Sequence, residues 1–254
     1  MNPLRPFAKR LVPETMKPKA LVERLICETE AGMRVRGGPF AGMRYTNAGY
    51  GVLACKLFGT YECELWPVIK SILEIPYDRV VDVGAGDGYY AIGFALFSKA
   101  QEIIAYDAAD EARNMLDEMA RANGVQRRIQ LKGWCTPEAL EHELEGNRCF
   151  LMMDVEGAEE QLLDPVEVPA LKTTPVLFES HDILHPGVGG RVVRRFLETH
   201  EIHEIGARYR QPTDITFLPQ WYVRYIRYEL FGRLLERPDK PERMRWFYLV
   251  PRKG

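Results

Sequence analysis

The chain has 254 residues, of which 46% are hydrophobic and 28% are charged, enough for one large α/β domain with additions. Its formal net charge of -2 argues against generic nucleic-acid binding, although both ends of the sequence are basic. No apolar run approaches the ~20 residues of a transmembrane helix, and the first residues lack the apolar core of a secretion signal. The five cysteines form no C-x-x-C pair, which is typical of reduced structural thiols. These features predict a soluble, cytoplasmic protein.

The first 75 residues differ in pattern from the rest of the chain. Residues 1–36 carry four prolines before a short helical pattern, which predicts an N-terminal arm, and residues 37–45 are turn-rich, which predicts a β-hairpin. Thr60 stands where it can N-cap a helix that ends near Ile75. The sequence therefore predicts two parts: residues 1–75, an arm and a segment that covers a ligand site, and residues 76–254, the main domain.

Strands and helices alternate regularly from Arg79 onward. Apolar runs predict strands at residues 79–83, 103–107, 129–132, 149–154 and 175–179, with helices at residues 89–99 and 109–123 and another from Pro137. Gly124 is predicted to end the second of these helices, and Thr136 before Pro137 is a well-formed helix start. The alternation predicts an α/β fold with a mostly parallel sheet that is covered on both faces.

The C-terminal part changes character. Two further strands are predicted at residues 202–209 and 244–251, with a helical insertion at about 213–241 between them. Within this insertion, residues 221–237 place apolar side chains on one helical face and arginines elsewhere. One interpretation is a helix that packs on the sheet or against a second copy in a homodimer. The other is a cap whose tyrosines and arginines bind a sugar or an anionic group.

A glycine-rich turn joins the first predicted strand to its helix and reads Asp82-Val-Gly84-Ala-Gly86-Asp-Gly88. Glycine allows a sharp turn with positive φ and a close approach of ligand to backbone, and the following helix N-terminus offers unpaired N–H donors. A dinucleotide fingerprint requires G-x-G-x-x-G, but Tyr89 stands at its third glycine. The spacing instead resembles the D-x-G-x-G-x-G first motif of class I S-adenosylmethionine-dependent methyltransferases. This resemblance implies that Asp82 and the three glycines bind that cofactor.

Four more residues are candidate cofactor contacts. Asp107 ends the second predicted strand, where a carboxylate can accept hydrogen bonds from both ribose hydroxyls of an adenosyl group, or it only caps the next helix. Trp134 stands where many such methyltransferases have an acidic residue near the adenine, so it can stack on that ring or belong to the core. Tyr61 and Glu62 precede the glycine turn by one helix. They can fold over the cofactor, or they form a helix cap with a packed tyrosine.

Three short segments narrow the resemblance. Residues 153–159, Met-Asp-Val-Glu-Gly-Ala-Glu, resemble the D-V-E-G-x-E signature of FkbM-type methyltransferases. Residues 178–181, Phe-Glu-Ser-His, resemble the E-x-H that ends their fifth strand, and residues 59–62 look like an upstream element of related bacterial members. The resemblance covers roughly residues 38–185. It implies S-adenosylmethionine as methyl donor, a Rossmann-like seven-stranded sheet with the last strand antiparallel, and O-methylation of a sugar, glycan or natural-product small molecule.

Asp154, Glu179 and His181 are the predicted catalytic residues, and Asp154 is also a predicted cofactor contact. They lie at the ends of neighbouring parallel strands, where ligands bind in sheets of this kind. Methyl transfer to oxygen requires that the acceptor hydroxyl lose its proton, either to a base such as His181 or Asp154, or with a metal that lowers the hydroxyl pKa. The hypothesis we favour is metal-free. Glu156 and Glu159 lie in the first turn of a predicted helix, where interaction with the helix dipole also explains them.

Two other functions are compatible with the glycine turn. A nicotinamide-dependent oxidoreductase is disfavoured by Tyr89 and by the lack of a Lys/Tyr or Cys catalytic pair. A non-catalytic adenosyl-binding subunit, docking through its basic arm and C-terminal helix, would bind the same cofactor. The intact acids on the acceptor side favour an enzyme over such a subunit.

Overall fold

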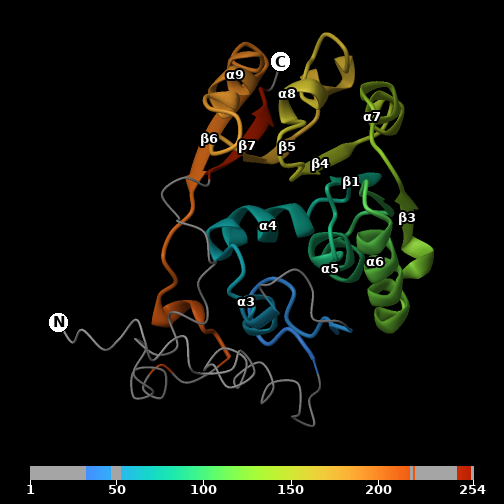
Figure 1. Cartoon of the computed structure of the whole chain (residues 1–254), viewed down its shortest axis with the longest axis vertical. Coiled ribbons are helices and arrows are strands. Elements are labelled where there is room, and N and C mark those ends of the chain that lie inside the picture. Colours follow the sequence, from blue (N-terminus) through green and yellow to red (C-terminus); the bar gives the residue numbers. More distant parts are fainter. Residues whose placement is uncertain (1–32, 47–52, 218–219, 221–244, 253–254) are drawn as a thin grey trace, which may run out of the picture.

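A computed structural model describes residues 33–46, 53–217, 220 and 245–252 (Figure 1). The predicted arm, apart from its last residues, lies outside this part, as does most of the predicted insertion at about 213–241. Its proposed cap or dimer helix at residues 221–237 is therefore not described. No helix within the described ranges has the length and apolar character needed to cross a membrane.

The core of the molecule is a seven-stranded sheet with the order β3-β2-β1-β4-β5-β7-β6. The strands are β1 Arg79–Val83, β2 Glu102–Tyr106, β3 Ile129–Lys132, β4 Cys149–Met153, β5 Val176–Ser180, β6 His200–Gly206 and β7 Arg245–Pro251. Strands β1 to β5 are parallel, and β7 is antiparallel to both β5 and β6. The predicted seven-stranded, mostly parallel sheet with an antiparallel last strand is confirmed.

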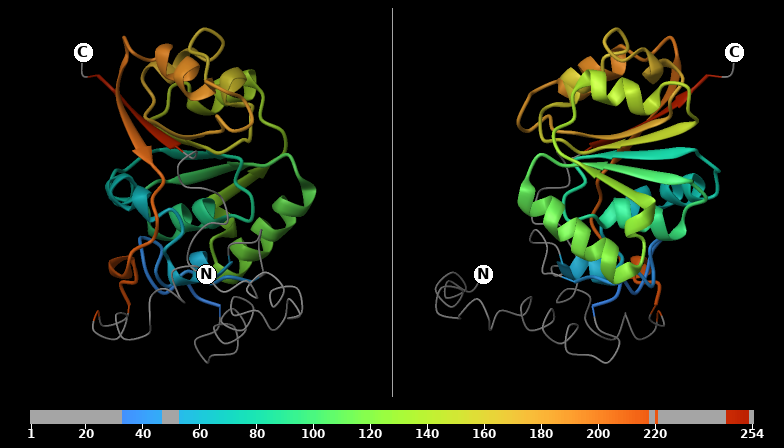
Figure 2. Two further views of the ribbon diagram at one scale, coloured as in Figure 1. Left: turned by 60° about the vertical axis from the view of Figure 1, so that its left-hand side comes forward. Right: turned by 90° about the vertical axis from the view of Figure 1, so that its right-hand side faces the viewer.

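Helices cover both faces of the sheet (Figure 2). They are α3 Leu53–Phe58, α4 Trp66–Leu73, α5 Tyr89–Phe97, α6 Asp110–Asn123, α7 Pro137–Leu144, α8 Glu159–Leu162 and α9 Val188–Arg194. Helices α4, α5 and α6 share one hydrophobic core with strand residues such as Val80, and α7, α8 and α9 share the other with residues such as Val81. Neighbouring residues of β1 thus point to opposite cores, which is why its sequence reads as a continuous apolar run.

The helix boundaries follow the expected end signals. Gly124 ends α6 in the left-handed conformation, and the Thr136 hydroxyl accepts a hydrogen bond from the Ala139 N–H at 3.2 Å at the start of α7. Both predictions are confirmed.

The segment before the sheet differs from its prediction. Thr60 does not cap a helix: it is fully buried, and a 3₁₀ turn at Cys63–Leu65 precedes α4. Helix α4 begins only at Trp66 because Pro67 fits the first turn, where its missing N–H needs no partner. The predicted β-hairpin is reduced to a single bridge between Arg34 and Arg44. Helix α3 was not predicted.

Candidate functional site

The three glycines of the turn, Gly84, Gly86 and Gly88, all have positive φ, but a side chain at each position would meet different surroundings. A Cβ on Gly84 would lie 1.8 Å from the Asp154 carbonyl oxygen, and a Cβ on Gly88 would lie 2.8 Å from Leu116 Cγ. Gly84 therefore lets β1 approach the end of β4, and Gly88 lets α5 pack on α6. A Cβ on Gly86 would meet nothing within 4 Å. Gly86 is the glycine of the turn that borders open space.

A cavity of about 620 Å³ opens beside this turn, a size suited to a small-molecule ligand. Seven predicted cofactor contacts line it: Tyr61, Asp82, Gly84, Gly86, Asp107, Trp134 and Asp154. Gly88 and Glu62 are not among the lining residues. Gly88 is taken up by helix packing, and Glu62 is buried behind the cavity wall, where it accepts a hydrogen bond from the Tyr90 hydroxyl.

Asp107 connects the ends of two elements at the cavity. One carboxylate oxygen accepts the Gly86 N–H at 2.8 Å, and the other accepts the Ala109 N–H at 2.9 Å, just before α6. Asp107 does not cap α6, whose N-cap residue is Ala109 and has no side-chain cap hydrogen bond. Asp107 holds the glycine turn and the residue just before the helix instead. A carboxylate has about four acceptor sites, so these two bonds leave capacity for ligand hydroxyls.

Trp134 is 68% exposed, so the alternative that it belongs to the core is wrong. Its ring lies at the cavity, where it is accessible to a flat ligand group. Tyr61 lines the cavity as well and packs edge-on against Tyr89, with ring centroids 5.2 Å apart.

Asp82 lies under the glycine turn and is only 3% exposed. Burial, together with the nearby carboxylates of Asp154 and Asp107, raises its pKa from 3.8 to about 8. Its Oδ2 has no hydrogen-bond partner within the described part of the chain. A buried acid of this kind favours a positively charged ligand, since a cation in the cavity would compensate its ionised form.

Lys56 and Asp87 form a buried ion pair at the cavity, which was not predicted from the sequence. Lys56 Nζ lies 2.8 and 2.7 Å from the two carboxylate oxygens of Asp87, and the Tyr45 hydroxyl donates a hydrogen bond to Asp87. Both Lys56 and Asp87 line the cavity. The available signal was a lysine within the otherwise apolar run Leu-Ala-Cys-Lys-Leu-Phe at residues 53–58.

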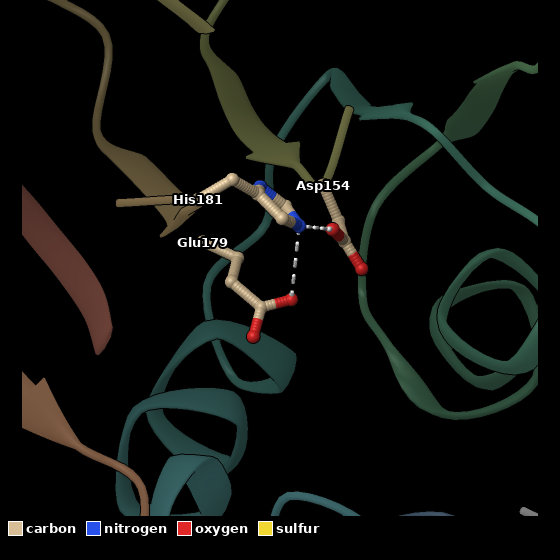
Figure 3. Close-up of side chains that lie close together, drawn as sticks. All are labelled: Asp154, Glu179 and His181. Carbon is tan, nitrogen blue, oxygen red and sulfur yellow. Dashed lines mark ion pairs between the residues drawn. The ribbon is translucent and has the colours of Figure 1, made fainter. Parts of the chain in front are cut away.

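The three predicted catalytic side chains converge at the carboxyl ends of β4 and β5 (Figure 3). His181 Nε2 lies 3.4 Å from Asp154 Oδ1 and 3.9 Å from Glu179 Oε2. One ligand atom from each residue lies within 4.8 Å of the others, a spacing that also suits a metal ion. Asp154 lines the cavity, whereas Glu179 and His181 stand behind it. Asp154 thus links this cluster to the cavity.

Glu159 orients the imidazole of His181. It is fully buried at the start of α8, and its Oε1 is hydrogen-bonded to His181 Nδ1. The carboxylate favours the tautomer with a proton on Nδ1, which leaves Nε2 directed at Asp154 and Glu179. Burial lowers the pKa of His181, but the hydrogen bond to Glu159 and the charges of Asp154, Glu159 and Glu156 outweigh it, so the pKa is raised above 6.5. The sequence analysis predicted only an interaction with the helix dipole for Glu159.

Within the described residues, Glu62 and Glu156 are the non-glycine residues with positive φ, each at 44°. Glu156 lines the cavity and Glu62 lies just behind it. Left-handed backbone at a non-glycine residue costs of order 1–3 kcal/mol and is concentrated at functional sites. Both strained residues therefore support the location of the site.

No protein-family model matches this sequence, and no curated protein is detectably similar to it. Solved structures with a similar fold include an rRNA methylase from Streptococcus thermophilus, which is 13% identical and matches over 74% of this chain and 93% of that chain, with a TM-score of 0.47. A SAM-dependent methyltransferase from Archaeoglobus fulgidus is 11% identical over 77% and 94%, with a TM-score of 0.47. A SAM-dependent O-methyltransferase from Thermotoga maritima is 14% identical over 75% and 66%, with a TM-score of 0.46.

Proposed function

We infer that this protein is an S-adenosylmethionine-dependent O-methyltransferase of the FkbM-like type, and that it acts on a hydroxyl of a sugar, glycan or natural-product small molecule. The observation that carries this inference is the cavity in which Gly86, Asp107 and Trp134 line the same space as Asp154. The proposed cofactor contacts and one of the proposed catalytic acids thus line a single cavity.

The lining residues fit S-adenosylmethionine chemically. Asp107 has acceptor capacity for the ribose hydroxyls, Trp134 offers an exposed ring for the adenine, and Gly86 leaves room for a ligand beside its backbone. Asp82, Asp154 and Glu156 add acidic character that suits a cationic sulfonium. The bound cofactor would supply an electrophilic methyl group for transfer to oxygen.

His181 is the proposed general base for the acceptor hydroxyl. Glu159 holds Nδ1, so the lone pair of Nε2 is directed at the region between Asp154 and Glu179. A hydroxyl that enters between these groups can pass its proton to Nε2 as the new carbon–oxygen bond forms. Asp154 and Glu179 then stabilise the resulting imidazolium.

The test is transfer of a labelled methyl group from S-adenosylmethionine to separate bacterial fractions of glycans, metabolites, RNA and protein. We expect label in a hydroxyl-bearing small molecule or glycan, and a loss of roughly 10²–10⁴ in kcat for His181→Ala with cofactor binding preserved. Label in RNA or protein instead would contradict the proposed acceptor class. Cofactor binding without transfer to any fraction would favour a non-catalytic subunit.

Turnover in excess EDTA distinguishes a general-base role of His181 from a metal site formed by Asp154, Glu179 and His181. The metal-free mechanism predicts undiminished activity. Complete loss that added Mg²⁺ or Mn²⁺ restores would contradict the general-base role and assign Asp154, Glu179 and His181 to a metal ion.

A further inference from the structure

The cavity wall contains five acidic residues and a single lysine or arginine among its described residues. The acids are Asp82, Asp87, Asp107, Asp154 and Glu156, and the cation is Lys56. Such a lining suits a ligand with more positive than negative charge. Any negative group on that ligand would have one cationic partner in the described wall.

Lys56 is held rigidly at this position. It is 6% exposed, its Nζ pairs with Asp87, and the ring centroids of Tyr61, Tyr89 and Tyr45 lie 5.1, 5.7 and 5.8 Å from Nζ. A buried ammonium is costly without such partners. An ammonium has three N–H donors, and the two contacts with Asp87 leave one donor for a further acceptor, as judged from the described residues.

Asp107 and Lys56 contact two successive residues of the glycine turn, Gly86 and Asp87. Asp107 accepts the Gly86 N–H, whereas Lys56 pairs with the side chain of Asp87. A ligand whose ribose contacts Asp107 can therefore extend across the turn towards Lys56, Tyr61 and Tyr89, which line the same cavity.

S-adenosylmethionine has two positive groups, the sulfonium and the ammonium, and one negative group, the carboxylate of its methionine part. We propose that Lys56 is the residue that recognises this carboxylate, so that a helix before the sheet selects the complete amino-acid end of the cofactor. This inference rests on the proposed function. The acidic groups of the wall remain for the two positive charges.

Calorimetry with two ligands and two proteins isolates this contact. Decarboxylated S-adenosylmethionine keeps the sulfonium and the ammonium but lacks the carboxylate. Wild-type protein is expected to bind S-adenosylmethionine at least about tenfold more tightly than the decarboxylated ligand, since the contact is a charge-assisted hydrogen bond. In Lys56→Met the ratio of the two dissociation constants is expected to fall to within about twofold, mainly through weaker binding of S-adenosylmethionine.

Two variants control the measurement. Asp107→Ala should weaken both ligands and leave their ratio as in the wild type. Because Lys56→Met leaves Asp87 buried without its cation, the double variant Lys56→Met/Asp87→Asn removes both charges, and its folding is checked by circular dichroism. It should show the same loss of selectivity.

Each outcome has a distinct meaning. A wild-type ratio near one, a ratio that persists in a folded Lys56 variant, or an equal loss for both ligands would overturn the role of Lys56 while leaving the proposed function intact. If the wild-type protein binds neither ligand, the proposed function itself fails.

Discussion

Glu159 illustrates how one buried carboxylate sets the protonation of a neighbouring side chain. Its hydrogen bond to His181 Nδ1, with the charges of Asp154, Glu159 and Glu156, outweighs the effect of burial and raises the pKa of His181. A general base works only in its deprotonated form. Activity should therefore fall as the pH drops through a value above 6.5, the ordinary pKa of histidine.

Glu159→Gln tests this coupling. The change removes a negative charge next to the ring, so the acidic limb of the kcat profile should move to lower pH, and kcat should fall because the ring is less firmly oriented. Glu160→Gln is the matched control, since Glu160 is its neighbour in α8 but pairs with Arg191. An acidic limb at the same pH in Glu159→Gln and wild type would contradict the assignment.

The raised pKa of Asp82 predicts how the stability of the folded protein depends on pH. Its pKa is raised from 3.8 to about 8 by burial and by Asp154 and Asp107, so between these pH values the folded state binds more protons than the unfolded state. Stability should therefore fall as the pH rises through this range. Asp82→Asn should raise the melting temperature of the cofactor-free protein at pH 8 and give little gain at pH 4. An equal change at both pH values would show that the ionisation of Asp82 is not the cause.

Valine substitutions at Gly86 and Gly124 distinguish two causes of lost cofactor binding: a side chain that occupies the cavity, and strain in the backbone. Gly86 and Gly124 both have positive φ, 54° and 69°, and an added Cβ has open space at both. Valine at either position should cost similar stability, because a β-branched residue is strained in the left-handed region. Only Gly86→Val should abolish cofactor binding in calorimetry. Comparable loss in Gly124→Val would mean that strain, and not occupancy of the cavity, is responsible.

The helices and strands of the sheet were largely predictable because each carries its own local signal. The apolar run of β1 and the cap formed by Thr136 and Pro137 are examples. The segment before the sheet was not, because α3 is only six residues long and its residues are all buried, so it has no amphipathic period. Thr60 had the chemistry of a cap but is buried one 3₁₀ turn before α4.

The cap of α7 can be tested alone. Thr136→Ala should lower the free energy of unfolding by about 1 kcal/mol, because the Ala139 N–H loses its acceptor. Urea unfolding should show a lower midpoint with the same slope. Thr173→Ala, at an exposed position, is the control and should change little; an unchanged midpoint in Thr136→Ala would contradict the cap.

Across the whole molecule, the residues of the site fall into two groups, those that were predicted from the sequence and those that were missed. Most of the predicted residues that follow a strand or belong to the glycine turn, such as Asp107 and Asp154, line the cavity, because the parallel order of the sheet brings them to one edge. Lys56 and Glu159 were missed because their roles depend on contacts with Asp87 and His181, which lie 31 and 22 residues away in the sequence. A lysine within an apolar run marked Lys56 as unusual, but local patterns do not identify the distant partner of such a residue.

Calorimetric titration of S-adenosylmethionine tests the central claim most directly. We predict that the wild-type protein binds S-adenosylmethionine and its demethylated product but not NAD, and that Asp107→Ala weakens binding at least about tenfold, because charge-assisted hydrogen bonds to the ribose are lost. Glu118→Ala, at an exposed position of α6, should bind as the wild type does. Unchanged affinity in Asp107→Ala, or binding of NAD in place of S-adenosylmethionine, would contradict the assignment of this cavity.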